Sequence, residues 1–430
     1  MSGGVTTTDV SPVHPHGEPD LTPWGVRVED WDEDEFVTGD PADGIHRVHV
    51  ADGGVLDVLL RGSPLSAPST VDRVPVFFAG AVTNRANRPG PFFSGHTISA
   101  TQGLPAILVA DPTITDHTDL SLGWYLGCDR FDATGAIVRV LQRLAARYGC
   151  RFLLVGGSGG GYAALAIAER LEGVASVLCW NPQTDVLEYN PRDVTRYVES
   201  AFDRESGAVD LAGARELLRA AHKQTVVGDA DVAREILYLQ NSGDWHVGKH
   251  VAPFVDRLGL SLGAGRASDP DGSTVVGFGS WGEGHAVPPR DVILRALTLM
   301  AHGSTPTECL EQLRRDHPAH FPELPSPEDH VAQYHWERTP DAIRVSAKGP
   351  HPAGTTFAYY AMVGTRRAMV RWYESDADFV FDPRELGGVD SVACFVRDLA
   401  GNQRSTVITL IEPERDGADR GDVAASRDAR

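Results

Sequence analysis

The clearest candidate for a chemically active group in this sequence is a serine with glycines on both sides. The run Gly156-Gly-Ser-Gly-Gly-Gly161 follows an apolar stretch and precedes an Ala-rich stretch with helical spacing. In such a G-x-S-x-G run, a sharp strand-to-helix turn exposes the serine hydroxyl, and glycines leave room for the turn. A dinucleotide fingerprint and a P-loop need other residues here. We predict that Ser158 is a nucleophile; the alternative is a glycine-rich turn without chemistry.

A serine hydroxyl attacks only when a neighbouring base takes its proton. The candidate base is His285, which lies in a Gly-rich loop after the last apolar strand of the central alternation. A carboxylate must orient that imidazole, and we predict Asp244, because it follows the preceding strand and gives the chain order nucleophile, acid, base. Asp185 and Glu283 are the alternative acids.

Acyl transfer also needs N–H donors for the developing oxyanion. We predict Gly159 as one donor and Gly80 or Ala81, in the turn after an early strand, as the other. Aromatic residues near these positions are candidates for a substrate pocket, with structural packing as the alternative. They are Tyr162, Trp245, Trp124 and Tyr125.

His246 and His250 have a spacing that can present two imidazoles to one metal ion on a helix. The glutamate of an H-E-x-x-H motif is missing, and no third ligand is evident. We therefore predict no metal and no cofactor, and assign these histidines to substrate contact or structure.

Elements that could position these groups alternate along the middle of the chain. Buried-looking apolar runs separated by helical stretches are typical of a mostly parallel sheet covered by helices, so the predicted fold class is α/β. Three early runs are interpreted as opening antiparallel strands. They span 45–50, 55–60 and 74–78, and later strands are expected at 106–110, 152–155, 175–180, 235–240 and 274–278.

The alternation predicts one large domain with additions. Residues 26–302 form the expected catalytic domain, interrupted at about 185–230 by two helical stretches that would make a cap or a peripheral decoration. A Pro-rich linker and closely spaced strand-like runs with Gly and Pro turns follow, which predicts a small β-sandwich. The remaining bounds are 303–330 for the linker, 331–412 for the sandwich, and 1–25 and 413–430 for disordered ends.

Composition restricts the partners. The formal charge is −20, and no basic stripe interrupts it, which argues against nucleic acid as a partner. The 5 cysteines are scattered, and neither a secretory signal nor an apolar run long enough to cross a bilayer is evident. These features predict a cytoplasmic protein.

The glycine-framed serine with Asp244 and His285, in order along the strand and helix alternation, resembles the α/β-hydrolase superfamily over residues 45–302. Within it, 110–112, 120–127 and 237–247 are similar to bacterial hydrolases tied to capsule or cell-surface glycan production and accessory secretion. That resemblance implies a serine hydrolase, and for some of those relatives it implies that they are carbohydrate O-acetyl esterases. The runs around Ser158 and His285 are also similar to prolyl-oligopeptidase-type peptidases, although the extra β module here follows the catalytic region.

These observations predict an enzyme that cleaves an ester, such as an acyl group on a sugar or glycan, through an acyl-serine intermediate. A peptidase or an acyltransferase would share this chemistry. The non-catalytic alternative is a hydrolase-fold scaffold in surface-glycan assembly. In either case the C-terminal module would bind a protein or glycan partner.

Overall fold

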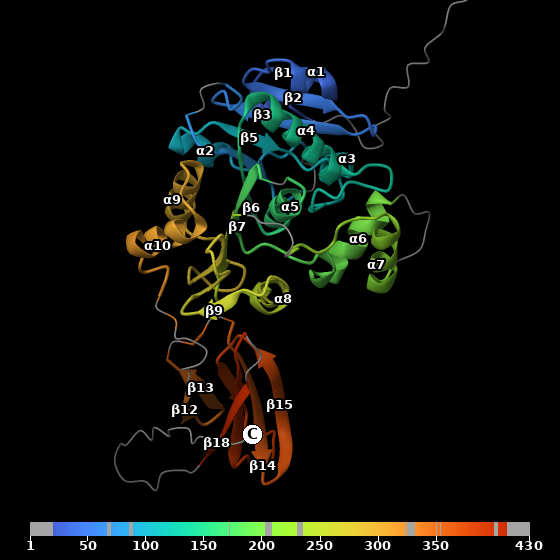
Figure 1. Cartoon of the computed structure of the whole chain (residues 1–430). Helices are drawn as coiled ribbons and strands as arrows, with labels where there is room; N and C mark the ends of the chain where they lie inside the picture. Colours follow the sequence, from blue (N-terminus) through green and yellow to red (C-terminus); the bar gives the residue numbers. More distant parts are fainter. Residues whose placement is uncertain are drawn as a thin grey trace, which may run out of the picture. The chain divides into compact units, whose positions relative to one another are not determined.

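The structure is a computed structural model (Figure 1). It describes residues 20–66, 70–85, 89–171, 173–202, 209–229, 235–322, 324, 332–349, 351–352, 354–399 and 403–410. The predicted disordered ends lie outside these residues except for 20–25, and of the predicted linker only 323 and 325–330 lie outside them. The chain forms two compact units. The first consists of the residues up to Glu235 together with Leu294–Ser304, and the second consists of Ile236–Ile293 together with the residues from Thr305 onwards.

The first unit is built on a twisted sheet with the strand order β1-β2-β3-β5-β4-β6-β7. The pairs β4–β5, β4–β6 and β6–β7 are parallel, whereas β3 is antiparallel to both of its neighbours. The strands are β1 (Val28–Asp32), β2 (Gly44–His49), β3 (Val55–Arg61), β4 (Val74–Phe78), β5 (Ala106–Val109), β6 (Phe152–Gly157) and β7 (Ala175–Trp180).

The prediction for β4 needs a correction. We expected 74–78 to continue an antiparallel opening, but β4 lies between β5 and β6 and is parallel to both. All five of its residues are buried. An apolar strand without alternation is typical of the middle of a parallel sheet. The prediction was wrong because it paired β4 with β2 and β3, the strands that precede it along the chain.

Helices pack against this sheet. α4 is amphipathic and ends at Tyr148, and the next residue, Gly149, closes its last turn with a left-handed φ of 61°. α5 is buried along its whole length and packs against β4, β6 and β7. The helices before β7 are η1 (Thr22–Trp24), α1 (Glu33–Thr38), α2 (His96–Gln102), α3 (Pro112–Asp116), α4 (Ala133–Tyr148) and α5 (Gly159–Ala168).

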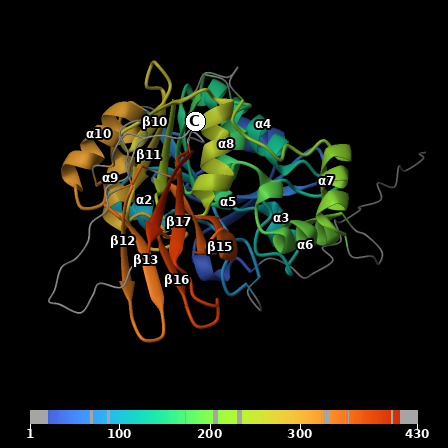
Figure 2. The same ribbon diagram turned by 90° about the horizontal axis from the view of Figure 1, so that it is seen from below.

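Between β7 and β8 the chain forms the two helices expected there. They follow a short turn, η2 (Val186–Glu188), and are α6 (Pro191–Ala201) and α7 (Leu211–Ala220), which lie side by side in both views (Figures 1 and 2). α6 begins cleanly because Asn190 accepts a hydrogen bond from the N–H of Arg192 and Pro191 occupies the first helical position. Its polar face and its buried face are well separated, as a surface helix requires.

The second unit contains the parallel pair β8–β11, and the antiparallel strands β10 and β9 extend this pair beyond β11. All six residues of β11 are buried. The elements are β8 (Glu235–Asn241), η3 (Val247–Val251), α8 (Ala252–Arg257), β9 (Ser261–Gly263), β10 (Arg266–Ser268), β11 (Thr274–Gly279) and α10 (Pro306–Asp316), and α9 (Arg290–Ala301) runs from the second unit into the first.

The C-terminal strands form two antiparallel sheets that share one apolar core, as a β-sandwich does. Tyr359 of one sheet stacks on Phe379 of the other, with ring centroids 5.3 Å apart and planes 9° from parallel. The three-stranded sheet is β12 (Gln333–Arg338), β13 (Ile343–Lys348) and β16 (Asp378–Phe381); the four-stranded sheet is β15 (Arg366–Glu374), β14 (Thr356–Val363), β17 (Ser391–Arg397) and β18 (Gln403–Thr409).

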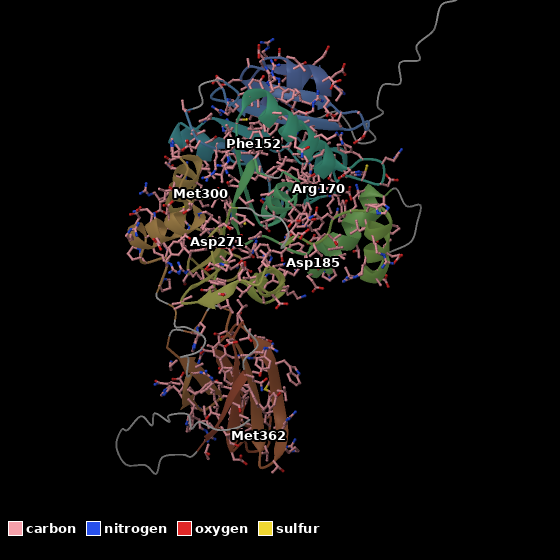
Figure 3. The ribbon with its side chains drawn as sticks, in the orientation of Figure 1. Phe152, Arg170, Asp185, Asp271, Met300 and Met362 are labelled. Atoms are coloured by element: carbon pink, nitrogen blue, oxygen red, sulfur yellow. The ribbon has the colours of Figure 1, made fainter. Side chains whose placement is uncertain are left out.

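Figure 3 adds the side chains, which lie densely around the sheet and helices of the first unit. Phe152, labelled there, begins the buried run of β6 that leads to the candidate nucleophile. In the part of the chain that the structure describes, no helix combines the length and apolarity needed to cross a bilayer.

Candidate active site

Ser158 occupies the sharp turn between β6 and α5, with φ 52° and ψ −121°. These angles mirror the extended region that L-residues prefer, so the serine is held in a strained conformation. Backbone hydrogen bonds on both sides of the residue fix it there. Its N–H donates to the carbonyl of Trp180 (3.0 Å), and its carbonyl accepts from the N–H of Tyr162 (3.1 Å). The strand-to-helix turn that the motif requires is therefore present.

The glycines around Ser158 are required by packing. A Cβ on Gly156 would lie 2.2 Å from the carbonyl oxygen of Gly160, and a Cβ on Gly160 would lie 2.5 Å from the carbonyl oxygen of Phe78. Both approaches are far inside van der Waals contact. The first turn of α5 can thus lie directly against β6 and β4 only because these positions carry no side chain.

Two of the predicted oxyanion donors lie beside Ser158. Gly159 is the first residue of α5, and N–H groups in the first turn of a helix have no intrahelical acceptor. Gly80 follows β4, and a Cβ built on it would lie 2.9 Å from the carbonyl oxygen of Gly157 and 3.8 Å from the Cβ of Ser158. Ala81 is the next residue and is exposed. The Gly80 backbone therefore passes close to the serine.

Tyr125 holds the start of this turn in place. Its hydroxyl accepts from the N–H of Ala79 (2.7 Å) and donates to the carbonyl of Val109 (2.9 Å), and its own N–H donates to Asp111 (3.1 Å). Burial raises the pKa of Asp111 to about 6, although the N–H groups that donate to it oppose the shift. The predicted pocket residue Tyr125 is fully buried and supports the backbone of the Gly80 turn.

Gln183 contacts the candidate nucleophile, and the sequence reasoning missed it. It is fully buried three residues after β7 ends at Trp180, and its side-chain amide donates to Oγ of Ser158 (3.2 Å). The indole N–H of Trp124 donates to the other end of the same amide. One signal could have found it, because polar residues directly after a parallel strand lie at the edge where ligands bind, and we considered only Asp185 there.

His285 is hydrogen-bonded to the predicted carboxylate. Its Nδ1 lies 2.6 Å from Oδ2 of Asp244, whose side chain is 0% exposed, whereas the imidazole is 34% exposed. Because a carboxylate only accepts, Nδ1 carries the proton and Nε2 presents a lone pair. Oδ1 of Asp244 accepts from the N–H of His246 (3.0 Å), and the amide of Gln240 donates to Oδ2 (3.4 Å). This is the arrangement of a general base with its orienting acid.

Asn241, the last residue of β8, fixes the loop that carries His285. Its side-chain amide donates to the carbonyls of Gly282 and Gly284, each at 2.8 Å, and its Oδ1 accepts from the N–H of Trp281 (3.3 Å). These bonds tie the loop after β11 to the end of the neighbouring strand β8. Sequence reasoning did not identify Asn241, because no local pattern shows that two strand ends are adjacent.

The two alternative acids are placed differently. Asp185, labelled in Figure 3, accepts from the N–H of Leu187 (2.9 Å) and so caps the short turn η2. Glu283 is exposed on the loop that carries His285. The carboxylate bonded to His285 is that of Asp244.

Comparison with protein-family models finds no match, and comparison with curated proteins finds none either. Among solved structures, the chain is similar to the capsule O-acetyltransferase of Neisseria meningitidis serogroup A (11% identity, TM-score 0.40, covering 62% of this chain and 98% of that one). It is also similar to acetyl xylan esterase from Aspergillus awamori (10% identity, TM-score 0.31, covering 58% of this chain and 94% of that one). A third similar structure is an alpha/beta hydrolase from Sphaerobacter thermophilus (13% identity, TM-score 0.32, covering 57% of this chain and 96% of that one).

The observations that decide the fold are the strand order of the first unit, the antiparallel β3, and the serine at the turn after β6. The chain has the α/β-hydrolase fold. The predicted fold class, this fold with a C-terminal β-sandwich, is confirmed. In α/β-hydrolases the catalytic groups follow in the order nucleophile, acid, base, which is the chain order of Ser158, Asp244 and His285.

Three side chains of the hydrolase fold could offer ligands to a metal. Donor atoms of Asp244, His246 and His285 lie within 4.8 Å of one another. Ligands of a tetrahedral zinc ion, bound at about 2.0–2.1 Å, lie about 3.4 Å apart. The 2.6 Å between His285 and Asp244 is shorter and matches a charge-assisted hydrogen bond. This pair is arranged to share a proton.

The ring of His246, from the H-x-x-x-H pair considered above, packs at an angle against both His285 and His250. The ring centroid of His246 lies 4.2 Å from that of His285 and 4.5 Å from that of His250. Burial, with the nearby His246 and Lys249, lowers the pKa of His250 to about 2. An uncharged His250 adds no positive charge next to the imidazolium that a general base becomes.

The predicted aromatic pocket residues differ in exposure. Trp124 and Tyr162 are 0% exposed, and the Tyr162 hydroxyl donates to the carbonyl of Gln224. Trp245 is 43% exposed and follows Asp244 directly. Of the four aromatic candidates, Trp245 thus has the surface with which to meet a ligand.

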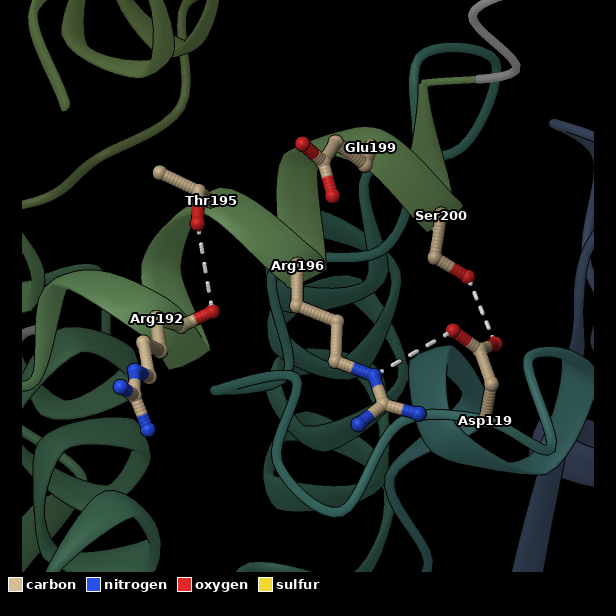
Figure 4. A pocket seen from close by; sticks show the side chains of 6 residues that line it. All are labelled: Asp119, Arg192, Thr195, Arg196, Glu199 and Ser200. Carbon is tan, nitrogen blue, oxygen red and sulfur yellow. Dashed lines mark hydrogen bonds and ion pairs between the residues drawn. The ribbon is translucent and has the colours of Figure 1, made fainter. Parts of the chain in front are cut away.

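An open hollow of about 660 Å³ lies on α6 (Figure 4). Asp119 accepts from the hydroxyl of Ser200 (2.7 Å) and pairs with Arg196 (3.6 Å). Among the described residues that line the hollow, none is a site residue predicted from the sequence.

Proposed function

We propose that this protein is a serine hydrolase that cleaves an ester through an acyl-Ser158 intermediate. The observation that carries the proposal is the backbone of Ser158, which is held at φ 52° and ψ −121° between a buried strand and a buried helix. Strain of this kind costs about 1–3 kcal/mol and persists where function requires it. The His285–Asp244 pair supplies the second requirement, a base whose tautomer is fixed.

In the proposed reaction, Nε2 of His285 takes the hydroxyl proton as Oγ of Ser158 bonds to the carbonyl carbon. The carbonyl π electrons move to oxygen, where the N–H groups of Gly159 and of Gly80 or Ala81 stabilise the charge. His285 then returns the proton to the departing alcohol, which leaves the acyl-serine. Water, deprotonated by the same imidazole, hydrolyses this ester and restores the hydroxyl.

We propose an acyl group on a sugar or glycan as the substrate. The support is the resemblance of 237–247 to hydrolases of surface-glycan production and the exposed indole of Trp245 beside Asp244, since aromatic side chains with one polar atom suit amphipathic ligands. A peptidase or an acyltransferase would use the same acyl-serine, so substrates must distinguish them.

The test is labelling of the full chain with a fluorophosphonate, which reacts covalently with an activated serine. Wild type should gain one probe mass, Ser158→Ala should gain none, and Ser200→Ala, which removes a hydroxyl on α6, should label like wild type. A wild type that labels no faster than Ser158→Ala would contradict the proposal and favour a non-catalytic scaffold. A panel of acetyl and butyryl nitrophenyl esters, acetylated sugars and aminoacyl anilides then assigns the substrate class.

We further propose that the predicted module at 331–412 recruits a protein or glycan partner. Trp372 of β15 is 64% exposed, and its ring lies 5.7 Å from that of Tyr360 on β14. Trp372→Ala should leave nitrophenyl acetate turnover unchanged and lower turnover of a polymeric acetylated glycan. If Trp372→Ala turned over both substrates as fast as wild type does, that result would count against recruitment through the exposed Trp372.

A further inference from the structure

The side-chain amide of Gln183 touches the atom that the proposed reaction uses as nucleophile, and the triad scheme gives it no role. Its Nε2 lies 3.2 Å from Oγ of Ser158, and its backbone N–H donates to the carbonyl of the same serine (3.3 Å). Gln183 is 0% exposed. A buried amide of this kind must satisfy its hydrogen-bonding groups inside the protein, so its orientation is determined by its neighbours.

Trp124 sets that orientation. An indole N–H can only donate, so the amide atom facing Trp124 is the carbonyl oxygen and the NH2 group faces Ser158. Trp124 is itself fixed, because it is fully buried and its ring packs edge-on against Tyr189 (6.1 Å) and Tyr197 (5.7 Å). An amide that could otherwise flip is thereby made a permanent donor to Oγ.

We propose that Gln183 is a catalytic residue that donates a hydrogen bond to Oγ of Ser158, and that Trp124 is the positioning residue that keeps the amide in its donor orientation. This inference rests on the proposed function. With one lone pair of Oγ engaged by Gln183, the hydroxyl proton cannot point at Gln183, because two donors would then face each other. The proton is left to the base.

The same bond acts on the transition state. As Oγ loses its proton to His285 and forms the bond to the carbonyl carbon, it carries partial negative charge, and hydrogen bonds to charged acceptors are stronger than neutral ones. In the finished acyl-serine, Oγ is an ester oxygen and a weak acceptor. The amide therefore stabilises the attacking oxygen more than the resting or acylated serine, which is the condition for accelerating acylation.

Gln183→Glu tests this inference with almost no change in shape. The introduced carboxyl can still accept from Trp124, but it presents an acceptor to Ser158 and competes with His285 for the hydroxyl proton. The second-order rate of fluorophosphonate labelling should fall about 100-fold at neutral pH. Lowering the pH should recover part of the loss relative to wild type, because the protonated carboxyl is again a donor.

Two further variants separate catalysis from structure. Gln183→Met removes the donor without adding an amide-like acceptor, and Trp124→Phe removes the indole N–H that orients the amide. Each variant should slow labelling about tenfold, and the double variant should be little slower than either alone. Melting temperatures of all variants are measured in parallel, with Ser200→Ala as the control. A purely structural role predicts additive losses that follow the melting temperature and do not respond to pH, and that result would overturn the inference.

The failure of this inference and that of the proposed function are distinguishable. If wild type does not label above Ser158→Ala, the proposed function fails. If wild type labels and Gln183→Glu labels within threefold of it, the proposed function stands and the role of Gln183 is refuted.

Discussion

Replacing Asp244 with asparagine should nearly abolish turnover while leaving the fold intact. The carboxylate is fully buried and lies 2.6 Å from Nδ1 of His285, so it stabilises the imidazolium formed when the base accepts the serine proton. With the charge centres roughly 4 Å apart and an effective dielectric constant of about 20, this attraction is worth about 4 kcal/mol. Each 1.36 kcal/mol is a factor of ten, so kcat should fall about 1000-fold.

The geometry adds to this loss. The N–H of His246 donates to Oδ1 of Asp244, so the oxygen of an introduced amide is favoured at that position, and its NH2 then replaces Oδ2 and faces His285. That arrangement favours the tautomer with the proton on Nε2, which cannot act as a base.

The assay is hydrolysis of a nitrophenyl ester at saturating substrate, with the labelling rate and the melting temperature measured on the same preparations. Asp185→Asn is the matched control, because Asp185 caps η2 and asparagine is an equally good cap. It should stay within about threefold of wild type. An Asp244→Asn enzyme within tenfold of wild type, or an equal loss in Asp185→Asn, would refute this assignment of the acid.

Three further substitutions follow from buried contacts. Tyr125→Phe leaves the N–H of Ala79 without its acceptor and should cost about 2 kcal/mol in urea denaturation; ester turnover should fall as well, and an unchanged free energy of unfolding would contradict the support role of Tyr125. Ser158→Gly relieves a mirror-image backbone, so it should be about 1 kcal/mol more stable than Ser158→Ala by thermal denaturation, whereas the ordinary cost of glycine predicts the opposite. Burial raises the pKa of Asp57 to about 6, so the unfolded chain releases this proton first and the wild type loses stability as the pH rises from about 4 to 6. Relative to Asp57→Asn, the wild type should lose about 2 kcal/mol between pH of about 4.5 and about 7, and a pH-independent difference would exclude this effect.

Local pattern predicted most of the first unit's strands. The apolar runs that become β2 to β7 and the glycines around Ser158 carry their signal within a few residues. Two edge strands, β1 and β12, gave no such signal. β1 contains three acidic residues in five, and β12 alternates polar with aromatic residues, so both exist because a neighbouring strand supplies their hydrogen bonds.

The candidate site divides in the same way. Ser158, His285 and Asp244 could be named because each follows a predicted strand and each has a defined chemical task. Gln183 and Asn241 could not, because glutamine and asparagine are common in loops and their importance comes from what lies across the fold. Only the geometry shows that one amide faces Oγ and that the other holds the loop of His285.

Strain connects these observations. Ser158 has a positive φ, and so do Trp124 and Tyr125, the two residues whose side chains hold Gln183 and the Ala79 turn. Each such conformation costs about 1–3 kcal/mol, which buried hydrogen bonds must offset. Those bonds are made by the side chains of Trp124, Tyr125 and Gln183, which are fully buried in the first unit. The buried packing of this unit therefore holds the backbones of Ser158, Trp124 and Tyr125 in conformations that an unconstrained chain would leave.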